Sequence, residues 1–378
     1  KQVSAVIARE RFEQAREAFA GPGGQEPAGG DTDWVAQLST DANGNWKKTV
    51  NNIVLILQND PQLKGKIALD EFSGRGMLLG GVPWDPSGRK RLWDDTDDAG
   101  LFWYLENQYH IAQQDRQDKA LAIVGKANQI NEVRDYLQGL SWDGVRRVDT
   151  LLADYLGAAD SAYTRAVMRK SLCAAVARAV VGAVKYDTMP IYTGPQGIGK
   201  STFLATLGKE WFSDSLTTFE GKEAAEVIQG TWINEVGELS AFTRQETQVV
   251  KQFLSKRDDI YRAAYGRRTE KHPRRCVFFG TSNDSEFLKD STGNRRFWPV
   301  DVGIHSARKS IWADLPGEVD QVWAEAYLYW QLGEPLDLSG EAEAQARKAQ
   351  EEHRESSSKE GLIRDFLEKP VPPGWEHM

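Results

Sequence analysis

One octapeptide, GPQGIGKS at Gly194–Ser201, constrains the fold of this chain most, because it matches the pattern G-x-x-x-x-G-K-S without a break. A short apolar run, Met189–Thr193, precedes it, and a helical pattern, Ser201–Leu207, follows it. A strand, a glycine-rich loop and a helix N-terminus in this order surround phosphate groups with backbone N–H donors. We therefore expect an α/β fold with a parallel sheet and a P-loop NTPase core.

Each position of this loop has an expected contact with a nucleoside triphosphate. Lys200 is expected to reach the β- and γ-phosphates, the Ser201 hydroxyl to bind Mg²⁺, and Thr202 to hold the α-phosphate side. A chance match of so short a pattern is the alternative, and the flanking strand and helix disfavour it. The expected cofactors are ATP and Mg²⁺, held by Gly194, Pro195, Gln196, Gly197, Ile198, Gly199, Lys200, Ser201 and Thr202.

An acidic pair follows the loop at a distance that suits such a site. The segment Gly230–Leu239 supplies an apolar strand and then Glu235 and Glu238. A P-loop needs an acid at the end of a neighbouring strand to hold magnesium and orient water. We assign Glu235 to the metal and water shell and to activation of the attacking water, with Glu238 as its partner. The two roles are interchangeable at this stage, and two solvated glutamates are the alternative.

A third apolar strand, Cys276–Gly280, ends in Thr281, Ser282 and Asn283. A polar amide just past such a strand is well placed to touch the γ-phosphate and the attacking water, so Asn283 is expected to act as a sensor. By itself an Asn after a strand is more often a turn former. The sensor interpretation therefore depends on the two preceding motifs.

Two adjacent arginines, Arg295 and Arg296, stand in the motif TGNRRFW. They are expected either to form an ion pair within the chain or to reach a neighbouring subunit's nucleotide as an arginine finger. We favour the finger and leave open which arginine supplies it. With these, the expected catalytic residues are Lys200, Glu235, Glu238, Asn283, Arg295 and Arg296.

The segment 251–275 concentrates positive charge. Nine of its residues are Lys or Arg and three are acidic, a local sum of +6 against −8 for the whole chain. The pattern predicts a hairpin with a basic tip, in which Tyr261 and Tyr265 interleave aromatic faces with the charge, as single-stranded nucleic acid binding requires. A solvated loop, or one that contacts ATP in the adjacent subunit, is the alternative. The expected nucleic-acid contacts are Lys256, Arg257, Arg262, Tyr265, Arg267, Arg268 and Lys271.

The composition, with 27% charged and 40% hydrophobic residues, is that of a soluble globular protein. Cys173 and Cys276 have no ligand-spaced neighbours, so we expect no zinc site, and so few cysteines fit a reducing cytoplasm. The longest apolar stretch, 171–184, is interrupted by Arg178 and is too short to cross a bilayer. We expect a cytoplasmic protein without a membrane partner.

The order of elements divides the chain into five expected segments. These are a helix and flexible linker (1–30), a small, mostly helical accessory domain (31–140), a helical lead-in (141–187), the P-loop ATPase domain (188–305), and a helical C-terminal region with a polar tail (306–378). One hairpin among short helices in the accessory domain suggests a winged-helix or other DNA-associated domain. The polar run 341–360 predicts a solvated helix or disorder. Because the chain starts at Lys1, we expect it to be part of a longer protein.

Several linked motifs, in a fixed order, resemble the virulence-associated protein E family of phage and mobile-element replication proteins. They are GPQGIGKSTF, KEAAEVIQGTWINEVGEL, KQFLSKRDDIYRAAYGRR, VFFGTSN and TGNRRFWPV, and WDGVRRVDTLL resembles the family's lead-in. The resemblance covers about Leu140 to Val302 and extends more weakly back to Lys66. This family is related to superfamily 3 helicases and to the helicase portions of primase-helicases.

The resemblance implies a superfamily 3/AAA+-like ATPase core, a hexameric or other ring of copies of the chain, and single-stranded or forked DNA tracked by the hairpin. It also implies partner replication proteins, or an upstream primase or polymerase-like domain. One departure is that Glu235 and Glu238 are spaced Glu-x-x-Glu, whereas superfamily 3 proteins usually carry an adjacent acidic pair.

The leading functional hypothesis is an ATP-driven DNA helicase or translocase in phage or mobile-element replication. An ATP-dependent DNA-binding switch or loader that does not unwind is the first alternative. A small-molecule P-loop kinase is a weaker one, because the basic hairpin and the arginine turn have no role in it.

Overall fold

The computed structural model describes residues 33–238, 241–261, 268–288 and 294–354. The helix and linker expected in 1–30 and the end of the polar tail lie outside these residues. The chain divides into two compact units, and the boundary between them in the sequence lies between Glu132 and Val133. None of the helices in the described ranges is both long and apolar enough to cross a membrane.

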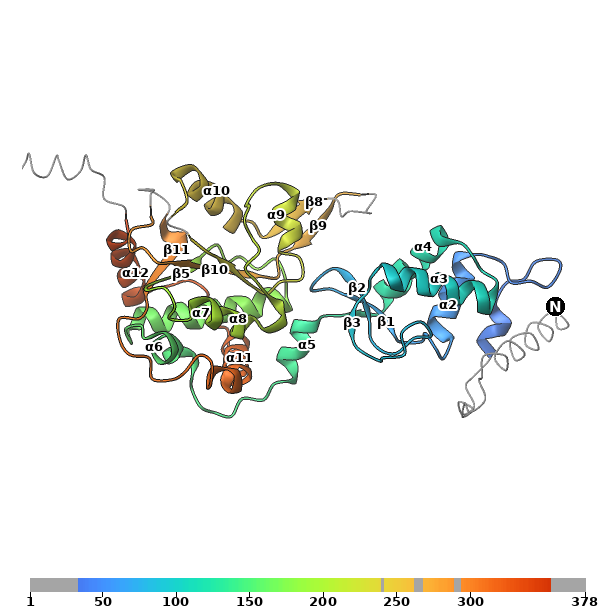
Figure 1. The fold of residues 1–378 in the computed structure, drawn as a ribbon, viewed down its shortest axis with the longest axis horizontal. Coiled ribbons are helices and arrows are strands. Elements are labelled where there is room, and N and C mark those ends of the chain that lie inside the picture. The colour runs from blue at the N-terminus through green and yellow to red at the C-terminus, as the bar shows by residue number, and fades with distance from the viewer. Residues whose placement is uncertain (1–32, 239–240, 262–267, 289–293, 355–378) are drawn as a thin grey trace, which may run out of the picture. The chain divides into compact units, whose positions relative to one another are not determined.

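In its described residues the first unit combines the α-helices α2, α3 and α4 with a small sheet (Figure 1). Its strand order is β3-β2-β1-β4, in which β1 pairs antiparallel with β2 and parallel with β4. The expected single hairpin, β1–β2, is therefore extended by two strands of only two residues each, too short to leave a sequence pattern. Its elements are α2 (Val50–Asn59), β1 (Ile67–Asp70), β2 (Arg75–Leu78), β3 (Arg91–Leu92), α3 (Asp95–Tyr109), α4 (Gln114–Ala127) and β4 (Gln129–Ile130).

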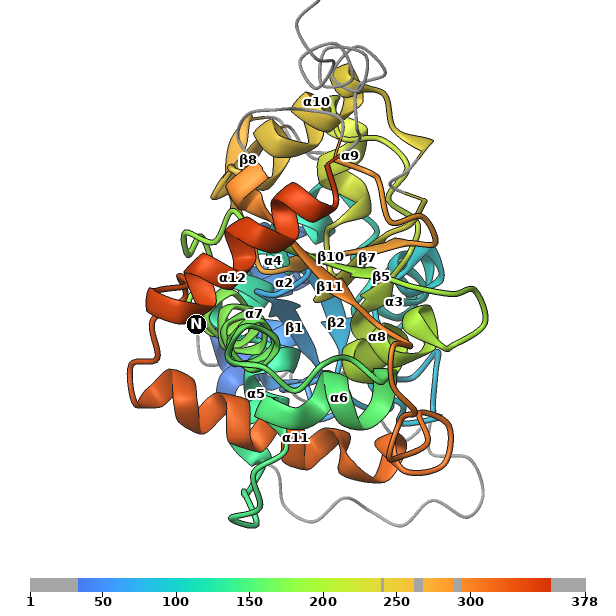
Figure 2. The same ribbon diagram turned by 90° about the vertical axis from the view of Figure 1, so that its left-hand side faces the viewer.

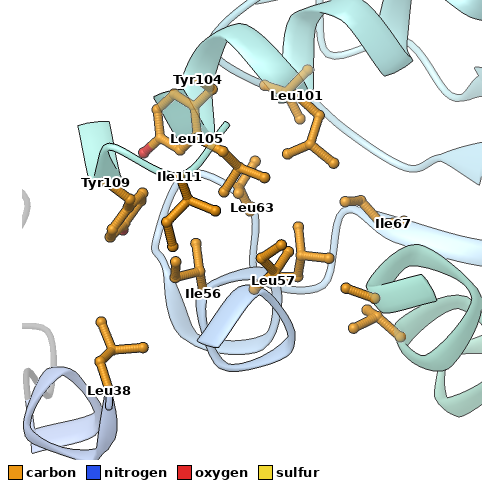
Figure 3. Packing of buried hydrophobic residues seen from close by; sticks show 14 of the residues in the cluster. Leu38, Ile56, Leu57, Leu63, Ile67, Leu101, Tyr104, Leu105, Tyr109 and Ile111 are labelled. Atoms are coloured by element: carbon orange, nitrogen blue, oxygen red, sulfur yellow. The ribbon is translucent and has the colours of Figure 1, made fainter. Parts of the chain in front are cut away.

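The core of this unit is formed by buried side chains of α2, α3 and α4 (Figure 3). Ile56 and Leu57 of α2 and Leu105 of α3 are almost completely buried in it. At its edge the buried carboxylate of Asp60 accepts hydrogen bonds from the hydroxyls of Tyr104 (2.7 Å) and Tyr109 (2.6 Å). A buried carboxylate requires such donors because burial without them would cost several kcal/mol.

The second unit contains a five-stranded sheet in which every strand pair is parallel, in the order β11-β5-β10-β7-β6. The predicted α/β fold with a parallel sheet is thus confirmed. The strands of this sheet are β5 (Met189–Thr193), β6 (Phe212–Ser213), β7 (Ile233–Val236), β10 (Val277–Ser282) and β11 (Phe297–Asp301), and β8 (Asp258–Tyr261) pairs separately with β9 (Glu270–Pro273). Its helices are α5 (Glu132–Gly139), α6 (Leu151–Leu156), α7 (Ala162–Val180), α8 (Lys200–Gly208), α9 (Gly221–Val227), α10 (Arg244–Leu254), α11 (Leu315–Gln331) and α12 (Gly340–Glu352).

Helices cover both faces of this sheet (Figures 1 and 2). Helices α7 and α8 lie on one face with α11 beyond them, and α9 and α10 lie on the other. On the first face the rings of Trp232 and Trp323 stack at 4.0 Å. Their indole N–H groups donate to the carbonyls of Ala175 in α7 and Leu207 in α8, both at 2.9 Å. These contacts fix α7, α8 and α11 together behind the sheet.

Helix α12 differs from the solvated helix or disorder expected for the polar run. Its Ala342 and Ala346 are buried, and the helix packs against α7 and β11 (Figure 2). Beyond it, the buried ring of His353 contacts the Asp301 carboxylate of β11 at 3.0 Å. A helix was one of the two expected alternatives and is present, but it is not fully solvated, because two small side chains are enough for close packing in a sequence that is otherwise polar.

Candidate functional site

The glycine-rich loop, Gly194–Ser201, connects β5 to α8 at the carboxyl end of the sheet. At its start, a β-carbon on Gly194 would lie 2.3 Å from the carbonyl oxygen of Val302, so any larger residue would clash. At its end, Gly199 adopts φ of 91°, a conformation that favours glycine, and N-caps α8. The loop therefore presents the helix N-terminus, with its unpaired N–H groups, where an anion is stabilised.

Lys200 is the first residue of α8 and is buried, with 8% of its surface exposed. Its Nζ donates to the carbonyls of Gly194 (2.7 Å) and Pro195 (2.9 Å) and to Oδ1 of Asn283 (3.0 Å). Loss of solvent lowers the pKa of Lys200, and the nearby charge of Glu235 opposes this effect. The structure thus brings together the lysine and the amide that the sequence predicts to face the γ-phosphate.

A second pair of contacts joins the loop to the acidic strand. The Ser201 hydroxyl donates to Oε1 of Glu235 at 2.7 Å, and the Thr281 hydroxyl donates to the same oxygen at 2.7 Å. Glu235 is only 5% exposed, so these two donors compensate for the solvent that its carboxylate has lost. Thr281 was missed as a site residue; the only signal in the sequence was its place at the end of an apolar strand.

The strand order corrects one expectation. The acidic strand β7 is not the direct neighbour of β5, because β10 lies between them. Within this arrangement Phe279 of β10 is level with Glu235 of β7, so Thr281 and Asn283 extend past the acid toward the loop. Since the carboxyl ends of parallel strands meet at one edge of the sheet, all three strands still contribute to the same site.

The two glutamates differ in their surroundings. Glu235 is buried at the end of β7, whereas Glu238 is exposed in the loop that follows and has a positive φ of 54°. A non-glycine residue in this region is uncommon and marks a constrained turn. Of the two, Glu235 is therefore the carboxylate that contacts α8.

The arginine turn, Asn294–Arg296, lies directly before β11. The Arg296 Nε donates to the Ser255 hydroxyl at 2.9 Å and lies 3.7 Å from the Asp187 carboxylate. The Arg295 side chain is 76% exposed and reaches the same carboxylate at 3.6 Å. Asp187 was not singled out because nothing in its local sequence relates it to the turn. Of the pair, Arg295 is the one that presents its guanidinium to solvent.

The predicted hairpin is present as the antiparallel pair β8–β9. Around its strands Lys256, Arg257, Arg268 and Lys271 are exposed. Ile260, opposite Lys271, is also 65% exposed. Arg262, Tyr265 and Arg267, which the sequence assigned to the hairpin tip, lie outside the described residues.

In the basic segment 251–275, Tyr261, Arg274 and Lys251 are buried and do not face solvent, contrary to what its charge pattern suggests. Tyr261 is not an exposed aromatic face, because it stacks on His272 with ring centroids 4.1 Å apart and is 6% exposed. Arg274 is buried and pairs with Asp259 at 2.7 Å, so it fixes the base of the hairpin. Lys251 likewise is buried and donates to Asn294. Charge counting cannot distinguish such structural cations from those that face solvent.

The atoms available to a cation at this site are oxygens. Within the described residues no group of three or more His, Cys, Asp or Glu side chains could hold a metal on its own. The hydroxyl of Ser201 and the carboxylate of Glu235 are ligands of the type that Mg²⁺ takes, commonly with one or two carboxylates and the phosphates of a substrate.

Comparison with known proteins gives one family and a set of structures. The model of the virulence-associated protein E-like domain matches residues 137–355. The A-form apo structure of the NrS-1 C-terminal region is similar with a TM-score of 0.43 and 12% identity, over 85% of this chain and 76% of that chain. A second apo structure of that region gives 0.40 and 13%, over 80% and 72%. No curated protein sequence matches the chain. The identities are too low to transfer the role of any residue.

Proposed function

The chain belongs to the virulence-associated protein E-like family, and we propose that it is an ATP-hydrolysing nucleic-acid motor, a DNA helicase or translocase in phage or mobile-element replication. One observation carries this proposal: the Ser201–Glu235 contact lies beside the Lys200–Asn283 contact at the carboxyl end of the sheet. These four side chains are what a P-loop NTPase core of the superfamily 3/AAA+-like class needs around a γ-phosphate.

In this proposal the loop and α8 hold the triphosphate. The backbone N–H groups of the loop receive the phosphate oxygens, and Lys200 exchanges its bonds to the Gly194 and Pro195 carbonyls for the β- and γ-phosphates. Ser201 and Glu235 would hold Mg²⁺, which supplies neutralisation of the phosphate charge when bound.

Hydrolysis requires a water molecule oriented toward the γ-phosphorus. We assign this task to Glu235, whose carboxylate is held in one orientation by Ser201 and Thr281. Asn283, already bonded to Lys200, would contact the γ-phosphate and report its presence. Glu238, exposed and outside these contacts, is assigned a supporting role only.

The exposed Arg295 suits an arginine finger that acts on the nucleotide of a neighbouring copy in a ring. Both arginines lie near Asp187, and Arg296 suits the other alternative, a contact within the chain, because it is also bonded to Ser255 and its side chain is only 23% exposed. The two arginines are thereby given different roles, one between subunits and one within the subunit.

The hairpin β8–β9 is the element proposed to contact DNA. Its exposed cations, Arg268 and Lys271, can contact phosphates of a single strand. Its base is rigid because Arg274 bonds both Asp259 and the carbonyl of Phe253 in α10. A rigid base allows motion in the ATPase core to be transmitted to the bound strand.

The proposal is tested by ATP turnover with and without single-stranded DNA, together with strand displacement on a forked duplex and sizing in the presence of ATP. A motor should form an oligomer, hydrolyse faster with DNA and displace the strand. If DNA leaves the rate of ATP turnover unchanged and no oligomer forms with ATP, the motor proposal is refuted. DNA-stimulated turnover without displacement would instead favour the switch or loader.

A further inference from the structure

A tryptophan lies against the glycine-rich loop at Gly199. A β-carbon built on Gly199 would lie 3.3 Å from Cζ2 of Trp312 and 2.7 Å from Cδ1 of Ile311. Ile311 is buried, with 2% of its surface exposed, whereas Trp312 is 63% exposed. The indole therefore touches the N-terminus of α8 with one edge and leaves most of its ring surface open to solvent.

The segment that carries this tryptophan is held at several points. Its start is fixed by backbone hydrogen bonds from Gly303 to Leu156 (2.7 Å) and from His305 to Gly157 (2.9 Å). Next to Trp312, Ser310 N–H donates to the Asp314 carboxylate at 2.7 Å. The indole is thus placed by ordered backbone on both sides, as a preorganised contact surface requires.

The sheet order gives the direction in which a bound nucleotide must extend. The groups expected at the γ-phosphate are Asn283, which follows β10, and Glu235, which lies at the end of β7, and both strands lie on one side of β5. Trp312 belongs to the segment after β11, which lies on the other side of β5. Since the γ-phosphate and the nucleoside are opposite ends of the molecule, a nucleotide whose γ-phosphate lies at Asn283 and Glu235 would have its nucleoside on the β11 side, toward Trp312.

We propose that Trp312 is the platform on which the base of the nucleotide stacks, which makes it a specificity-determining residue for nucleotides over bare polyphosphate. This inference rests on the proposed nucleotide site. An indole ring offers a wide π face, and every base can stack on such a face. Because Trp312 would contact only the base, it should increase the affinity for ATP and leave the affinity for a polyphosphate without a base unchanged.

The test uses the full chain and two probes with Mg²⁺, ATP and inorganic tripolyphosphate, with affinities measured by calorimetry. Trp312→Ala should weaken ATP binding about tenfold, in line with the loss of one stacked base, and leave tripolyphosphate affinity unchanged. Trp312→Phe should restore most of the ATP affinity because it retains a ring. Trp103→Ala, which removes another exposed tryptophan (44%) in the first unit, should change neither affinity.

Other outcomes distinguish a failure of the stacking role from a failure of the proposed nucleotide site. Unchanged ATP affinity in Trp312→Ala, with loss of binding in Lys200→Ala, would overturn the stacking role and leave the nucleotide site intact. Equal losses for ATP and tripolyphosphate in Trp312→Ala would also overturn it, since the tryptophan would then only support the loop. If the wild-type chain binds neither probe, the nucleotide site fails and the inference fails with it.

Discussion

The hydroxyl of Ser201 donates a 2.7 Å hydrogen bond to Oε1 of Glu235, which links the first turn of α8 to the end of β7. The two residues are 34 positions apart in the chain. Thr281, from the strand between β5 and β7, completes the contact on the same oxygen. The parallel sheet is what brings these three side chains to one edge.

Glu235→Gln should retain ATP binding and lower hydrolysis by at least about 100-fold, the usual effect of losing a positioned general base. The amide oxygen can still accept from Ser201 and Thr281, so the fold should be retained. Turnover and nucleotide affinity, measured on the same preparation, check this prediction.

The matched control is Glu238→Gln, which removes the same charge from an exposed residue three positions later. It should lower turnover much less than Glu235→Gln. A larger loss in Glu238→Gln than in Glu235→Gln would show that the roles of the two glutamates are exchanged.

The arginine turn predicts different effects of two adjacent substitutions, one on stability and one on turnover. Arg296→Ala should lower the free energy of unfolding by about 1 kcal/mol, because it removes the bond to Ser255. Arg295→Ala should leave stability unchanged and lower turnover on the order of 1,000-fold, only where the chain is oligomeric. Urea unfolding and turnover against protein concentration measure the two effects. Equal loss of turnover in a dilute monomer would contradict a finger that acts between subunits.

The hairpin predicts a change in the salt dependence of DNA binding. Arg268→Ala with Lys271→Ala should weaken single-stranded DNA binding and reduce its salt slope by about one unit per residue removed. Basal hydrolysis should not change. The control pair, Arg347→Ala with Lys348→Ala, removes two exposed cations from α12 and should leave the slope as it is. Identical slopes in all three proteins would exclude the hairpin as the contact.

His353 predicts a pH dependence of stability. Burial acts to lower the pKa of His353, but its hydrogen bonds to Asp301 and to the Ala349 carbonyl outweigh this and raise the pKa above 6.5. Because the folded pKa is the higher one, the added stability is fully present below about 6.5 and disappears as pH rises through the folded value. The stability that protonated His353 adds should not exceed about 1 kcal/mol, because the carboxylate of Asp301 is half exposed and solvent weakens the interaction.

Urea unfolding of the wild type and Asp301→Asn from about pH 5 to 9 measures this effect. The wild type should be the more stable at low pH, and the difference should shrink as pH rises. A difference that grows with pH would contradict the assignment.

The sequence predicts best what is encoded locally. The glycine-rich loop carries its strand and helix on either side, so the parallel α/β fold and Lys200 could be predicted from one motif. The positions of Glu235 and Asn283 beside the loop could be predicted because each lies at or just past the end of an apolar strand. The order of those strands, with β10 between β5 and β7, depends on long-range packing and leaves no local pattern.

Contacts between distant segments account for what could not be predicted. The pairing of β5 with β11 brings Asp187 to the arginine turn, and the pairing of β8 with β9 places His272 against Tyr261. Trp312 gave no signal either, since its position beside Gly199 results from the course of the chain after β11.

The most direct test of the account is phosphate release from ATP and Mg²⁺ by the wild type and by Lys200→Ala, with single-stranded DNA absent and present. The wild type should hydrolyse ATP, and faster with DNA, whereas Lys200→Ala should not hydrolyse it in either condition. Full hydrolysis by Lys200→Ala would contradict the assignment of the glycine-rich loop as the site of ATP hydrolysis.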